Sequence, residues 1–172
     1  MPFHYGKIKL DNSIKVGLDS APIKVVEYIN LRCPDSRDYE LKVAPYLESY
    51  IEEGKVQRII KHFDKEVREL EKGYLMNQYI NYDRHSESYQ MIHQLFKEQK
   101  TWARNRISQL PHIALNYGLT LEKDNQKMAL EVMNEVDAIA IEKIPTVFIG
   151  EKAFVETIDF DEFKKEIDAN LL

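Results

Sequence analysis

Short apolar runs and one amphipathic stretch alternate in the first part of the chain. Residues 23–31 are almost continuously apolar and rich in β-branched side chains, which predicts a strand buried on both faces. Apolar side chains then recur at helical spacing over residues 41–51, which predicts a helix that ends at Gly54. Residues 56–63 read as a second strand. A strand, a crossover helix and another strand are typical of two parallel neighbouring strands.

Before the first of these strands, the pattern predicts a small hairpin. Two short runs, residues 7–10 and 14–17, flank the turn-forming Asp11-Asn12-Ser13. We therefore expect two paired strands over residues 8–16.

The middle of the chain shows only helical spacing. From Asp64 to about Glu142 the apolar side chains recur every three or four positions, ending with a group around Val132. The stretch is too long for a loop in a compact domain. We predict a helical insertion of three or four helices over residues 64–142, within a domain formed by residues 1–63 and 143–172.

The C-terminal part returns to strands. Residues 144–149 and 153–156 flank the turn Gly150-Glu151-Lys152, which predicts an antiparallel hairpin. Asp159 is a candidate N-cap for a closing amphipathic helix. Together, the elements predict an α/β fold.

Composition and charge exclude several classes of protein. The chain of 172 residues is 44% hydrophobic and carries a net charge of −5. No basic face is apparent, which argues against a nucleic-acid partner. No stretch approaches the roughly 20 apolar residues of a membrane span. The N-terminus has no apolar run behind a basic start, so we expect a cytoplasmic protein if Met1 is the native start.

The single cysteine, Cys33, stands where a strand ends and a helix begins. Pro34 fits the first helical turn, since its missing N–H costs nothing there. The unpaired N–H groups and the positive end of the helix dipole favour a thiolate. Arg32 and Arg37 add positive charge, and Asp35 opposes them. This setting favours a surface-reachable thiol over a buried apolar cysteine.

The motif around Cys33 resembles a known family. Residues 17–28, followed by Cys33-Pro34-Asp35-Ser36, resemble the opening of the DsbA-related thiol–disulfide oxidoreductases of the thioredoxin-like superfamily. Residues 144–149 resemble the cis-proline strand of that superfamily, and residues 113–119 are similar to part of its helical insertion. The resemblance implies a thioredoxin-like fold with a central mixed sheet and a helical insertion. It also implies that Pro145 follows a cis peptide bond and lies against the catalytic sulfur, with the preceding backbone pairing to a bound peptide.

Ser36 departs from the family pattern, because it stands at the position of the family's second cysteine. A dithiol enzyme uses its second sulfur to release the mixed disulfide, and a serine cannot do so. We therefore predict a cytoplasmic monothiol oxidoreductase. Cys33 would form a mixed disulfide with a protein or a low-molecular-weight thiol, and an external thiol would resolve it.

The predicted site contains five residues with two kinds of role. Cys33 is the candidate nucleophile, and Ser36 is a candidate hydrogen-bond donor to its thiolate. Pro34, Ile144 and Pro145 are the candidate substrate-binding residues that the resemblance implies.

Two alternatives stay open. One is a thioredoxin-fold adaptor that binds a protein partner without redox turnover. The other is a kappa-type glutathione transferase or isomerase, a class that often has serine at the position of Cys33. No histidine spacing typical of a metal site and no glycine-rich phosphate loop occur, so no cofactor is predicted. Trp102, close to Arg104 and Arg106, is a further candidate for the edge of a pocket.

Overall fold

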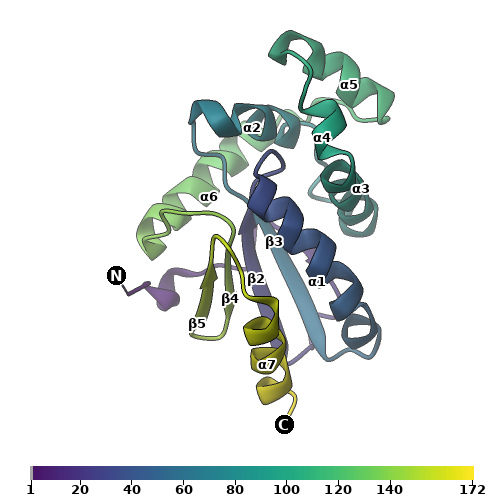
Figure 1. The fold of residues 1–172 in the computed structure, drawn as a ribbon. Helices are drawn as coiled ribbons and strands as arrows, with labels where there is room; N and C mark the ends of the chain where they lie inside the picture. Colours follow the sequence, from purple (N-terminus) through teal and green to yellow (C-terminus); the bar gives the residue numbers. More distant parts are fainter. Residues whose placement is uncertain (1) are drawn as a thin grey trace.

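A five-stranded mixed sheet forms the centre of the molecule (Figure 1). The computed structural model describes residues 2–172. The strands are β1 (Ile14–Val16), β2 (Ile23–Ile29), β3 (Val56–His62), β4 (Thr146–Ile149) and β5 (Lys152–Val155), in the spatial order β1-β3-β2-β4-β5. β2 and β3 are parallel, and the other pairs are antiparallel. The predicted parallel pair and the predicted C-terminal hairpin are both confirmed.

Helix α1 (Pro34–Glu52) connects β2 to β3 and packs on one face of the sheet together with α7 (Phe160–Asn170). Their apolar side chains, including Leu47 and Phe163, meet the odd-numbered residues of β2, such as Val25. The carboxylate of Asp159 accepts hydrogen bonds from the first backbone N–H groups of α7, which confirms the predicted N-cap.

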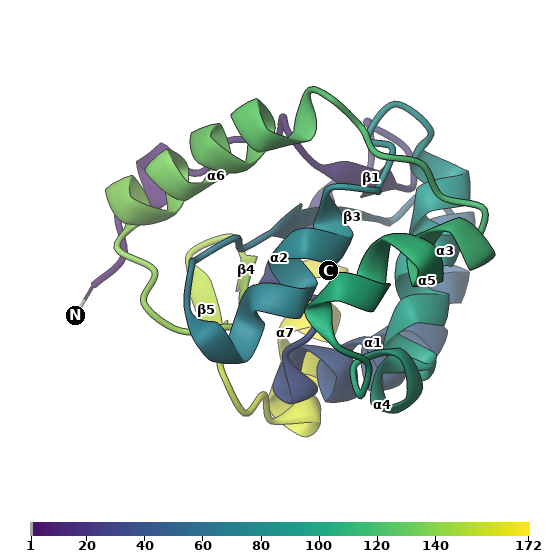
Figure 2. The ribbon, with the colours of Figure 1, turned by 90° about the horizontal axis from the view of Figure 1, so that it is seen from above.

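Helix α6 (Asn125–Ile139) covers the opposite face of the sheet (Figures 1 and 2). Val132 and Val136 pack against Tyr28 and Phe148. Because side chains alternate along a strand, β2 presents Val25 to α1 and Val26 to α6. This two-sided burial explains the continuous apolar run that predicts β2.

All elements between β3 and β4 are helical. They are η2 (Arg68–Leu70), α2 (Glu71–Asn77), α3 (His85–Lys97), α4 (Gln99–Trp102), η3 (Ile107–Gln109), α5 (Leu110–Asn116) and α6. The region thus has five α-helices, not the predicted three or four. The additional one is α4, whose four residues are too few to show a periodic pattern. Within residues 2–172, no helix is long and apolar enough to cross a membrane.

The predicted hairpin over residues 8–16 is wrong. Tyr5–Lys7 forms a 3₁₀ turn, and β1 pairs with the edge of β3 instead, with Ile14 opposite Ile60. Pairing with the sheet buries Ile14 completely. An isolated two-stranded hairpin has no core of its own, so the sheet edge is the more stable partner.

Candidate active site

Cys33 is the N-cap residue of α1, as the sequence predicts for a helix start. Its Sγ accepts a hydrogen bond from the backbone N–H of Ser36 at 3.4 Å. Only 6% of the residue is exposed, because it belongs to the apolar cluster beneath α6. The prediction of a surface-reachable thiol in preference to a buried cysteine is therefore wrong, although the N-terminus of α1 does direct a backbone N–H donor at the sulfur.

The loop before β4 brings Ile144 and Pro145 to the same place. The carbonyl oxygen of Ile144 lies 4.0 Å from Cys33 Sγ, and the Ile144–Pro145 peptide bond is cis. The carbonyl of Pro145 accepts the N–H of Glu156 at 2.7 Å, which ties this loop to the end of β5. Pro34, on the other side of Cys33, is exposed. The structure thus brings the Ile144 carbonyl, in the loop before β4, to the sulfur of Cys33.

Ser36 is fully buried one turn into α1. Its hydroxyl accepts the N–H of Asn30 at 3.3 Å, at the end of β2. The hydrogen bond to Cys33 Sγ therefore comes from the backbone of Ser36 and not, as predicted, from its hydroxyl.

Two amides hold the loop between β2 and α1. The buried Gln99 of α4 donates through Nε2 to the carbonyls of Leu31, at 2.7 Å, and Cys33, at 3.1 Å. Asn30 donates to the carbonyl of Phe63 at 3.0 Å and accepts the N–H of Arg32 at 2.8 Å. Sequence reasoning missed both residues. The signal for Asn30 is a polar side chain at the end of an apolar run, whereas Gln99 gives none.

A buried histidine supports the same loop from β3. The N–H of Leu31 donates to His62 Nε2 at 3.0 Å, so the proton of the neutral ring is on Nδ1. Nδ1 lies 2.6 Å from Asp64, and Asp64 also accepts Asn77 Nδ2 at 2.8 Å. Among residues 2–172, no group of three or more potential metal ligands occurs.

A buried ionic cluster lies on the α1 face of the sheet. Arg58 of β3 makes a bidentate pair with Glu27, at 2.8 and 2.5 Å, and reaches Glu40 of α1 at 2.6 Å. His93 Nδ1 lies 2.7 Å from the other oxygen of Glu40. Burial raises the pKa of Glu27 above its usual value, against the opposing effect of Arg58. Burial also acts to raise the pKa of Glu40, but Arg58 and His93 together hold it below its usual value.

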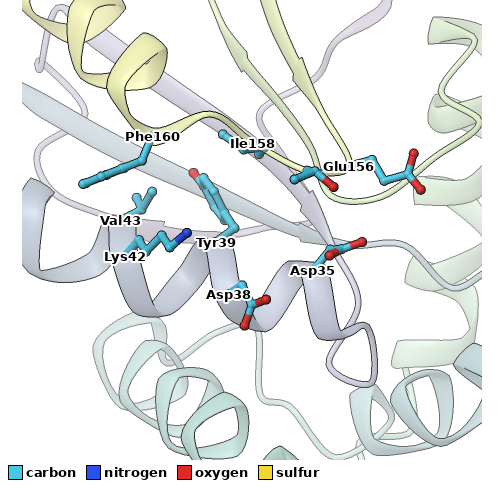
Figure 3. Close-up of a pocket in the computed structure, with 9 residues that line it drawn as sticks. Asp35, Asp38, Tyr39, Lys42, Val43, Glu156, Ile158 and Phe160 are labelled. Atoms are coloured by element: carbon cyan, nitrogen blue, oxygen red, sulfur yellow. The ribbon is translucent and has the colours of Figure 1, made fainter.

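A small acidic pocket of about 70 Å³ lies along the first turns of α1 (Figure 3). Its three carboxylates are Asp35 and Asp38 of α1 and Glu156 of the segment after β5, and Lys42 of α1 is its one cation. The carboxylates of Asp35 and Asp38 therefore lie within the first turn or two of α1, the helix whose N-cap is Cys33.

Comparison with known proteins agrees with this geometry. A family model described as thioredoxin matches residues 9–169. The chain belongs to the DsbA-related thioredoxin-like superfamily.

Relatives within this thioredoxin-like superfamily cover nearly the whole chain. The probable disulfide bond formation protein D of Bacillus cereus is 26% identical over 170 residues, which is 91% of this chain and 77% of that protein. A solved structure of a conserved protein of unknown function from Enterococcus faecalis V583 is 32% identical, with a TM-score of 0.90 over 96% of this chain and 95% of that one. Oxidised BdbD from Bacillus subtilis shares the fold, with a TM-score of 0.74, 17% identity and 95% coverage of both chains. The DsbA-like fold is thus independently supported by sequence and by structure.

Proposed function

We propose that this protein is a monothiol thiol–disulfide oxidoreductase with Cys33 as its nucleophile. The observation that carries the proposal is the placement of Cys33 Sγ at the N-cap of α1, beside the Ser36 N–H and 4.0 Å from the Ile144 carbonyl. A helix N-terminus stabilises the thiolate, which is the attacking form. Relatives named as disulfide bond formation proteins support this class of chemistry.

In the proposed reaction, the Cys33 thiolate attacks one sulfur of a substrate disulfide. A new S–S bond forms to Cys33, and the other substrate sulfur leaves as a thiolate with the electron pair. Ser36 has no sulfur to attack the mixed disulfide, so a second, external thiol must do so and regenerate the Cys33 thiolate. Since Pro34 is the exposed neighbour of Cys33, we propose that the substrate approaches over Pro34 and contacts Ile144 and Pro145.

The proposed compartment is the cytoplasm. A chain with one cysteine forms no internal disulfide, and its monothiol cycle needs a supply of reduced external thiols. Fractionation of cells that express the tagged chain tests this, and recovery of the chain outside the cytoplasmic fraction would contradict it.

The mechanism is tested by trapping the mixed disulfide. After reaction with bis(2-hydroxyethyl) disulfide, we expect the mass of the wild-type protein to show a stable adduct that added 2-mercaptoethanol removes. Cys33→Ser should form no adduct. Ser36→Cys should lose the adduct to an internal disulfide, because the introduced thiol lies one turn from Cys33. A wild-type protein that forms no adduct would refute the proposal.

The low exposure of Cys33, 6%, favours a second candidate, an adaptor that binds a protein partner at this face without redox turnover. In this case a partner recovered with the wild-type protein should also be recovered with Cys33→Ser. Loss of the partner in Cys33→Ser, together with adduct formation in the wild type, would favour the oxidoreductase.

A further inference from the structure

Positive charge gathers on one side of Cys33, opposite in sign to the acidic pocket of Figure 3. A pocket of about 410 Å³ lies between the start of α1 and α4. Its charged lining consists of four cations, Arg32, Arg37, Lys100 and Arg104, and one carboxylate, Asp38, and we call it the basic pocket. Arg32 directly precedes Cys33 in the chain, and Pro34, which also lines the pocket, directly follows it. The basic pocket is therefore lined by both chain neighbours of Cys33.

The position of α4 at this end of α1 is fixed by hydrogen bonds (Figure 1). Gln99, the first residue of α4, donates to the carbonyl of Cys33 itself. Lys72 of α2 donates to the carbonyl of Ala103 at 2.6 Å, just after the end of α4. Lys100 and Arg104 are thus held beside the site by a buried side chain, although both are themselves exposed. The sequence pointed to Trp102 as a pocket edge, but Trp102 is buried and Arg104 lines the pocket instead.

The cations of the basic pocket are poorly neutralised. Within the described part of the chain, Arg32, Lys100 and Arg104 make no ion pair. Arg37 reaches only the exposed Asp38, at 3.3 Å. The Nε of Arg37 is buried and has no hydrogen-bond partner among residues 2–172. A buried donor without an acceptor is costly, and a guanidinium group matches a carboxylate in geometry.

We propose that the basic pocket binds the carboxylates of a low-molecular-weight acidic thiol, the resolving partner of the Cys33 cycle. This rests on the proposed function of Cys33 and names its second substrate. A pocket of this volume falls in the range typical of small-molecule sites. The lining combines several donors with two apolar residues, Ala103 and Pro34, and Pro34 directly follows Cys33 in the chain.

The reaction is balanced with this thiol as reductant. When a protein carries the small thiol as a mixed disulfide, the Cys33 thiolate attacks the sulfur of the small thiol, and the protein sulfur leaves as a thiolate. A second molecule of the small thiol, as its thiolate, then attacks the same sulfur. The small-molecule disulfide forms and Cys33 leaves as a thiolate, so one free small thiol is oxidised for each mixed disulfide reduced, and the protein regains one S–H.

The test compares the rates at which Cys33 reacts with three probe disulfides. Each rate is divided by the rate at which free cysteine reacts with the same probe. The probes are glutathione disulfide, which carries carboxylates, neutral bis(2-hydroxyethyl) disulfide and cationic cystamine. We expect glutathione disulfide to react fastest and to slow as salt is added, because salt screens exposed charges.

The variant Lys100→Gln/Arg104→Gln should slow the reaction with glutathione disulfide about tenfold, because two contacts to carboxylates are lost. Its reaction with the neutral probe should stay within about twofold, since no charge takes part. The matched control is Lys123→Gln/Lys127→Gln, which removes the same charge from exposed positions outside the pocket. It should leave all three rates within about twofold.

Each outcome decides one point. If Cys33 reacts with none of the probes, the proposed function fails and this inference with it. If Cys33 reacts with the neutral probe, but the rates show no preference for glutathione disulfide or the control variant slows it equally, the basic pocket inference fails and the proposed function stands. A charge preference found only with a disulfide-linked peptide of eight residues, rich in Asp and Glu, would assign the pocket to acidic protein segments and overturn the small-thiol inference.

Discussion

The two faces of the sheet each bury a charged cluster, but only one cluster reaches the surface. The arginine cluster on the α1 face consists of Glu27, Glu40, Arg58 and His93. The lysine cluster on the α6 face consists of Lys61, Glu135 and Tyr28. In the arginine cluster the side chain of His93 is 32% exposed, whereas both charged side chains of the lysine cluster are at most 2% exposed.

The clusters also differ in charge balance. One arginine faces two carboxylates on the α1 face, and an arginine stays protonated. Lys61 faces a single carboxylate, Glu135, at 2.6 Å and also donates to the carbonyl of Lys9 at 2.9 Å. Burial lowers the pKa of Lys61, and Glu135 opposes this shift. The lysine cluster thus pairs one cation with one carboxylate, whereas the arginine cluster holds two carboxylates beside one guanidinium.

The largest expected effect is the loss of Arg58, because two carboxylates then remain buried without a cation. We expect Arg58→Met to lower the free energy of unfolding at pH 7 by at least about 4 kcal/mol, or to prevent folding. Urea unfolding measures this. Adding Glu27→Gln and Glu40→Gln in the same chain should recover part of the loss, and a loss below about 1 kcal/mol for Arg58→Met alone would show that the cluster is not held by Arg58.

The next largest loss of stability is expected in the lysine cluster, whose charged side chains are both buried. Glu135→Ala should lower the free energy of unfolding by about 3 kcal/mol, because Lys61 is left buried without its counter-charge. The double variant Lys61→Met/Glu135→Gln removes both charges and keeps an acceptor for the hydroxyl of Tyr28. We expect it to come within about 1.5 kcal/mol of the wild type by the same urea measurement. If the double variant is less stable than Glu135→Ala, the pair is needed for packing and not for charge compensation.

These clusters also show which features of the structure the sequence pattern predicts and which it does not. Hydrophobic periodicity predicts β2, α1, β3 and the C-terminal hairpin, because each is defined by its own buried face. It does not predict that Lys61 pairs with Glu135, 74 residues away, since no local pattern encodes the contact between α6 and the sheet. In the same way the position of Cys33 at a helix start follows from its neighbours in the chain. The placement of the Ile144 carbonyl near Cys33 Sγ depends instead on packing between elements that are far apart in the chain. The same holds for the hydrogen bond from Gln99 to the Cys33 carbonyl.

The two carboxylates of the arginine cluster should respond to pH in opposite directions. The pKa of Glu40 is lowered in the folded state, so its contribution to stability is present above its usual value of 4.5 and is lost as the pH falls through the folded value. The pKa of Glu27 is raised from the same value, so stability falls as the pH rises from 4.5 through its folded value.

Urea unfolding of single variants from pH 3 to 8 checks this difference. Relative to the wild type, Glu40→Gln should lose stability as the pH rises, and Glu27→Gln should gain stability as the pH rises. Parallel pH profiles for the two variants would show that the carboxylates share one proton equally, contrary to the assignment above.

The smallest effect is expected for His93, the partly exposed member of the arginine cluster. It tests whether this cluster, unlike the lysine cluster, is connected to the solvent. His93→Ala removes a partly exposed contact to Glu40, so we expect a loss of about 1 kcal/mol or less at pH 7. His93 is one of the groups that lower the pKa of Glu40, so the acid-induced loss of stability should begin at a higher pH in the variant. Lys97→Ala, on the same helix and exposed, is the control, since it removes a positive side chain without touching Glu40. An acid profile that moves equally in both variants would mean that general surface charge, and not contact with Glu40, connects this cluster to the solvent.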